Sequence, residues 1–248
     1  MANTIDEVIT DLTNIIELAD SEASRIGYFA ALYRRVTIRV KEQIAGGFFL
    51  NAAQMERLDV EFANRYLEAY GQFRNGQPTT ASWAAAFNAT RSWRPLIIQH
   101  LLLGMNAHIN LDLGIAAQKT CPGELLPSLK PDFDAINQIL AEMVQPVETQ
   151  LAGVSPWIGL LNKVNAKADE VILNFSMKIA RGAAWKFALE LNEAGHGDRA
   201  AVITRKDEEI AQLAATVASP HGIVLNAGLL AIRLRETSDV RRVIAALR

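Results

Sequence analysis

Two histidines, two asparagines and an aspartate interrupt the most apolar stretch of the chain, HLLLGMNAHINLDLGIAA, which covers residues 100–117. A polar group that loses water without gaining a partner costs free energy, so a buried segment normally avoids such groups. At about 100° per residue, four positions spaced by four residues form one slowly drifting stripe along a helix: His100, Gly104, His108 and Asp112. This stripe predicts a functional site.

The pair His108 and Asp112 lies one helical turn apart, so the two side chains can meet directly. In one chemistry that uses this spacing, both side chains bind one divalent metal ion. In the other, Asp112 fixes the tautomer of His108 and stabilises its protonated form, which makes His108 a general base or acid. No third metal ligand lies at a standard spacing, and both chemistries stay open.

Three further residues of the stretch have expected roles beside this pair. His100 lies about 12 Å from His108 along the helix axis, so we expect it to line the far end of a pocket or to bond a neighbouring helix. Gly104 costs the helix about 1 kcal/mol relative to alanine, which makes sense if a side chain or a ligand approaches the backbone there. Asn106 would hydrogen-bond the substrate if a neighbouring helix or a bend brings it to the site.

Two other predicted helices supply candidate substrate-binding groups. Arg34 lies mid-helix and could pair with Asp112 or with an anionic substrate. Arg181 and Trp185 are four residues apart and suit stacking or cation–π contact. Asp59, beside an apolar stripe, is interpreted as a solvated charge. The predicted catalytic residues are His100, Asn106, His108 and Asp112, and the predicted substrate-binding residues are Tyr33, Arg34, Thr37, Gly104, Arg181 and Trp185.

Helical periodicity dominates the elements that must position these residues, and no alternating strand pattern occurs. The segment near 95–118 is apolar around most of its circumference, which is typical of a helix in the middle of a bundle. With no repeat and no linker, the sequence predicts a single all-α domain over residues 1–248, a multi-helix bundle around this central helix. The other main helices are expected over about 4–19, 21–45, 51–75, 131–146 and 165–194.

Composition excludes several classes of protein. The net charge of -2 gives no overall basicity for a nucleic-acid partner. The single cysteine, Cys121, offers no disulfide framework and fits a reducing cytoplasm. Six polar residues within 96–117 argue against a membrane span. We therefore expect a cytoplasmic protein whose partner is a small molecule.

The run His100-Leu-Leu-Leu-Gly104-Met-Asn106-Ala107-His108-Ile109 resembles the H-x-x-x-G-x-N-A-H-I signature of a bacterial family of unknown function with about this chain length. The resemblance implies a single all-α domain and carries no activity. The H-x-x-x-D pair is also similar in outline to the central helix of the zinc phospholipase C and single-strand nuclease group. Here the sequence after Asp112 lacks the next histidine ligand of that group.

Together these features predict an enzyme with a buried His/Asp site on its central helix. Hydrolysis or proton-transfer chemistry, such as that of a lyase, isomerase or cyclase, suits a small and partly apolar substrate in such a pocket. The alternative is a carrier or sensor that holds a small molecule in the same pocket without changing it.

Overall fold

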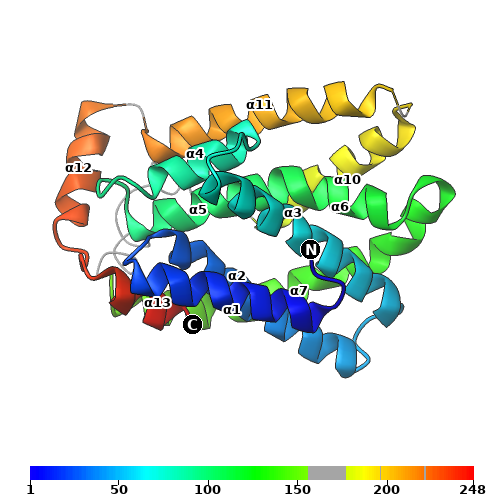
Figure 1. Cartoon of the computed structure of the whole chain (residues 1–248), viewed down its shortest axis with the longest axis horizontal. Coiled ribbons are helices and arrows are strands. Elements are labelled where there is room, and N and C mark those ends of the chain that lie inside the picture. The colour runs from blue at the N-terminus through cyan, green and yellow to red at the C-terminus, as the bar shows by residue number, and fades with distance from the viewer. Residues whose placement is uncertain (156–176, 196, 221) are drawn as a thin grey trace.

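In the computed structural model of the chain, residues 1–155, 177–195, 197–220 and 222–248 are described, and every regular element in these ranges is a helix (Figure 1). The predicted all-α bundle is thereby confirmed. None of the helices in these ranges is long and apolar enough to cross a membrane. The elements are α1 (Ile5–Ser21), α2 (Ile26–Ala45), α3 (Ala52–Arg74), α4 (Ala81–Ala89), α5 (Ile97–Ala107), the π-helix η1 (His108–Asp112), α6 (Leu113–Thr120), the 3₁₀-helix η2 (Gly123–Leu125), α7 (Leu126–Ala152), α10 (Met177–Glu193), α11 (Arg199–Ala218), α12 (Ile223–Arg233) and α13 (Val240–Leu247).

Local sequence signals set several helix ends as expected. The side chain of Thr4 accepts a hydrogen bond from the backbone N–H of Glu7 at the start of α1, and Asn51 accepts one from Gln54 at the start of α3. These side chains satisfy backbone donors that have no partner within the helix. After α2, Gly47 takes a φ of 72°, a left-handed conformation that favours glycine.

The structure differs from the prediction at Pro131, and part of another predicted helix lies outside the described residues. Pro131 does not open a helix: α7 already begins at Leu126, with a proline in its first turn, and continues through Pro131 and Pro146. A proline in the first turn removes no needed hydrogen bond, whereas each later one removes a single bond that the long helix tolerates. The predicted helix from 165 to 194 is described from Met177 onward, and its residues 165–176 lie outside the described ranges.

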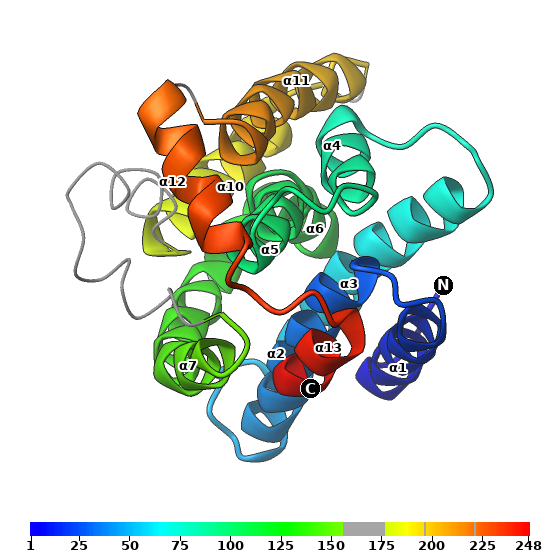
Figure 2. The same ribbon diagram turned by 90° about the vertical axis from the view of Figure 1, so that its left-hand side faces the viewer.

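The elements α5, η1 and α6 follow one another as a continuous central helix from 97 to 120, which confirms the buried helix predicted near 95–118. Figure 2 looks along this helix and shows the other helices around it. It contacts α2, α3, α4, α7, α10 and α11. Two glycines allow the closest approaches. A Cβ at Gly104 would lie 2.6 Å from the Phe29 ring, and one at Gly114 would lie 2.7 Å from the ring of Phe187.

Candidate functional site

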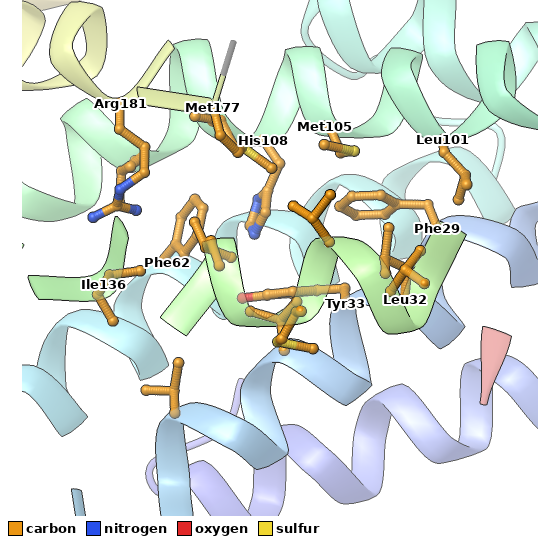
Figure 3. Close-up of a pocket in the computed structure, with 18 of the residues that line it drawn as sticks. Phe29, Leu32, Tyr33, Phe62, Leu101, Met105, His108, Ile136, Met177 and Arg181 are labelled. Atoms are coloured by element: carbon orange, nitrogen blue, oxygen red, sulfur yellow. The ribbon is translucent and has the colours of Figure 1, made fainter. Parts of the chain in front are cut away.

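A cavity of about 310 Å³ lies between the central helix and the helices α2, α3, α7 and α10 (Figure 3). Its walls are mostly aliphatic, aromatic and methionine side chains. Ligand cavities are commonly of this kind, with a few polar groups that fix the orientation of the bound molecule. Among the residues that the structure describes, the polar or charged ones that line this cavity are Tyr33, Asp59, His108, Glu148 and Arg181.

A π-helical turn carries the predicted histidine–aspartate pair. Within η1 the N–H of Leu113 bonds the carbonyl of His108, five residues earlier instead of four. Single π turns inside α-helices are rare and occur frequently at functional sites. Nδ1 of His108 lies 3.5 Å from Oδ2 of Asp112, which is an electrostatic contact and not a well-formed hydrogen bond. The predicted proximity of the pair is therefore present, in a helical geometry that the sequence did not indicate.

The carboxylate of Asp112 is buried and held from two other helices. Its Oδ2 accepts a hydrogen bond of 2.8 Å from the indole Nε1 of Trp83 on α4. Its Oδ1 lies 3.2 Å from Nε of Arg65 on α3, which forms an ion pair with it. The sequence indicates Arg34 as a cation that could pair with Asp112, but the cation is Arg65. These donors offset the desolvation of the carboxylate.

The imidazole of His108 is enclosed by aromatic rings. It stacks on Phe62 with the ring centroids 3.5 Å apart and meets the ring of Tyr33 edge-on at 4.4 Å. Figure 3 shows the ring projecting between Phe62 and Met105. Burial lowers the pKa of His108, and the charge of Asp112 opposes this change in part. The ring is therefore neutral near pH 7, and its Nε2 has no hydrogen-bond partner.

Two more buried polar groups line the cavity beside His108. The hydroxyl of Tyr33 and Oδ2 of Asp59 have no hydrogen-bond partner. Burial raises the pKa of Asp59 to about 7, with a further contribution from the charge of Glu56. Burial also raises the pKa of Tyr33 well above its usual value, so its hydroxyl keeps its proton. The interpretation of Asp59 as a solvated charge is wrong, because only 9% of its surface is exposed.

Arg181 lies on α10 and forms part of the cavity wall. It has no ion pair among the described residues. Its Nη2 donates a hydrogen bond to the carbonyl of Phe133, and its guanidinium stands 4.5 Å from the centre of that residue's ring. Its Nε is buried and unpartnered. Burial lowers the pKa of Arg181 to about 10, against the charge of Asp134, so the group is still cationic at neutral pH.

Four of the six predicted substrate-binding residues do not line this cavity, and three of these four, Arg34, Thr37 and Trp185, lie outside the central helix. Nε of Arg34 donates to Oγ1 of Thr13 on α1, on the other side of α2. The buried hydroxyl of Thr37 bonds back to the carbonyl of Tyr33 in its own helix. Trp185 packs against Phe133, with ring centroids 5.0 Å apart. The structure thus brings Tyr33 and Arg181 to the cavity and leaves these three in the surrounding framework.

Three other predicted residues of the central helix, His100, Gly104 and Asn106, also lie outside the cavity lining. His100 packs edge-on against Tyr28, and burial lowers its pKa to about 3. Asn106 faces α11, where its Nδ2 donates to the carbonyl of Ile210 at 3.0 Å. At Gly104 the expected close approach is made by a side chain, the Phe29 ring described above. His108 is therefore the histidine that the structure brings to the cavity.

The residues around Asp112 fit acid–base chemistry better than metal binding. Within the described part of the chain, no three His, Cys, Asp or Glu side chains come together as a metal site requires. The carboxylate of Asp112 already faces the cation Arg65, whose charge disfavours a second cation. A buried carboxylate beside a neutral imidazole can instead orient that ring and stabilise its protonated form.

Comparison with known proteins gives one match. No curated protein matches the chain, and no solved structure does. A family model matches residues 5–220, a range that includes all the helices lining the cavity. The predicted kinship with a family of unknown function is confirmed, and the match carries no activity. The chain belongs to DUF5995, a family of unknown function.

Proposed function

We propose that the chain is an enzyme that binds a small, largely apolar molecule in this cavity and transfers a proton at His108. One observation carries the proposal. Of the five described polar side chains that line the cavity, four hold a buried polar atom with no partner among the described residues: Tyr33, Asp59, His108 and Arg181. A buried polar atom left unsatisfied costs about 1–3 kcal/mol, and a ligand with matching groups would recover that free energy.

The surroundings of His108 suit a general base. The charge of Asp112 beside Nδ1 favours the tautomer that carries its proton there, which leaves the lone pair on Nε2. Since burial lowers the pKa of His108, the ring is in the neutral form that can accept a proton. The proton would come from the bound molecule and would return to another of its atoms, as in an isomerase or a lyase.

Neighbouring groups would support the charge that then develops. The imidazolium would lie against the face of Phe62, where an aromatic ring attracts a cation. Asp112, held by Trp83 and Arg65, would supply the compensating negative charge at a fixed position. The hydroxyl of Tyr33 keeps its proton and can donate a hydrogen bond to an oxygen of the ligand.

A carrier or sensor is the second candidate, and it is favoured by the same burial that lowers the pKa of His108. A desolvated imidazole is a weaker base, and the cavity wall is otherwise almost wholly apolar. Such a cavity could hold an apolar molecule without reacting with it.

Proton transfer and binding can be measured separately. Small apolar ketones and aldehydes are incubated with the purified protein in deuterated water, and exchange beside the carbonyl is followed by nuclear magnetic resonance. We expect exchange that is lost in His108→Gln and retained in His100→Gln, a matched change of a buried histidine outside the cavity. Binding without exchange would favour the carrier, and the absence of binding by every probe would refute both functions.

A further inference from the structure

Arg181 brings to the cavity wall a positive charge that no described residue compensates with an ion pair. Only 5% of its surface is exposed, and it takes part in none of the ion pairs among the described residues. Within the described part of the chain, its hydrogen bond goes to a neutral carbonyl, that of Phe133. The acid whose charge acts on it, Asp134, is half exposed and is already paired with Lys130. A buried charge without a partner is costly, so a protein normally compensates it.

The other ionisable groups of the cavity do not supply that compensation at neutral pH. Glu148 is exposed, and water screens its charge. Burial raises the pKa of Asp59 to about 7, so its carboxyl tends to keep its proton below that pH. His108 is neutral because burial lowers its pKa. Among the described residues, the main charge that the cavity wall presents is therefore the positive one of Arg181.

The cavity has apolar walls beyond this charge. In Figure 3, Arg181 and Ile136 lie on one side of the cavity, Leu101 and Leu32 lie on the other, and His108 is between them. At about 30 Å³ for each water-sized group, a volume of about 310 Å³ holds roughly ten non-hydrogen atoms. This is the size of a short hydrocarbon chain with one polar head group.

We infer that the ligand is a medium-chain carboxylate whose head group binds Arg181 and whose hydrocarbon chain lies along the apolar walls toward Leu101. The planar guanidinium matches a carboxylate, and its unpartnered Nε is free to donate. This order places His108 beside the middle of the chain and not beside the head group, so a proton that His108 removes would come from a carbon next to a second carbonyl group within the chain. The inference rests on the proposed function and names the class of molecule that the cavity takes.

Three probes with the same chain length test it by calorimetry at pH 6.5: octanoate, octan-1-ol and octylammonium. We expect wild type to bind octanoate at least about tenfold more tightly than octan-1-ol, the effect of one charge-assisted hydrogen-bonded pair. Arg181→Gln should lose this preference and still bind octan-1-ol, whereas Arg181→Lys should keep part of it. Arg34→Gln, which changes an arginine outside the cavity, is the matched control and should bind like wild type.

The outcomes separate the two proposals, and the wild-type comparison is decisive even if an Arg181 variant fails to fold. Equal binding of octanoate and octan-1-ol would refute the carboxylate inference and leave the apolar cavity function in place. A preference for octylammonium would refute it as well and would identify Asp59 as the charge that governs the cavity. If none of the three probes binds, both the inference and the proposed function are wrong.

Discussion

Asp59 makes the stability of this protein depend on pH, and the substitution Asp59→Asn isolates its contribution. Its pKa is about 7 in the folded chain, mainly because of burial, against an ordinary value of 3.8. Between these two values the folded chain holds a proton that the unfolded chain has released. The free energy of unfolding therefore falls as the pH rises from about 4 to about 7, and Asp59 is destabilising above that range. The amide introduced by Asp59→Asn has no such proton to lose.

The size of the effect follows from the gap between the two pKa values. About three pKa units at about 1.36 kcal/mol each give roughly 4 kcal/mol. Relative to wild type, Asp59→Asn should therefore gain about 4 kcal/mol of stability between pH 4 and pH 8. A fixed cost of the amide in the cavity shifts the difference equally at every pH and leaves the slope unchanged.

Urea unfolding followed by circular dichroism at each pH from 4 to 8 measures this difference. Glu17→Gln is the matched control, because Glu17 is an exposed carboxylate on α1. The control should give a nearly flat difference from wild type. A flat difference for Asp59→Asn as well would mean that Asp59 ionises normally in the folded chain, and the description of the cavity as a desolvating site would be refuted.

Three more substitutions test the contacts around the site. Gly104→Ala puts a methyl group into the ring of Phe29 and should cost about 1–3 kcal/mol in thermal unfolding, whereas Gly182→Ala, with open space at that position, should be neutral or stabilising. Trp83→Phe removes the hydrogen bond to Asp112 and should cost about 1–3 kcal/mol in urea unfolding. Asp112→Asn removes the charge that raises the pKa of the neighbouring histidine ring, so a nuclear magnetic resonance titration should show that pKa falling further.

The central helix could be predicted from sequence because its apolar side chains surround it, and such a helix must be covered on all sides. For the same reason, its pattern could not indicate which neighbour each polar residue would meet. Asn106 meets a carbonyl of α11, while His108 faces the cavity. The π turn that begins at His108 leaves no mark in the sequence, and it changes the direction in which the later residues point.

The partners on α3 were harder to predict, because periodicity describes the faces of one helix and not its contacts with another. Arg65 reaches Asp112 across 47 positions of the chain. The position of Asp59 did indicate burial, although Asp59 was interpreted as a solvated charge. It lies four residues after Met55 and three before Phe62, on the stripe that turns inward. A carboxylate at such a position is either paired or protonated, and here burial raises its pKa.

The polar groups on the two sides of the central helix thus differ in whether they have hydrogen-bond partners. Toward α11 its polar side chains are satisfied, since Gln99 donates to the carbonyl of Val217 and Asn106 to that of Ile210. Toward the cavity, Nε2 of His108 and the groups facing it from α2, α3 and α10 have no partners. A protein selected only for stability would have filled this space with apolar side chains or paired its polar atoms. The free energy that these atoms cost without a partner is what a ligand with a suitable head group can recover.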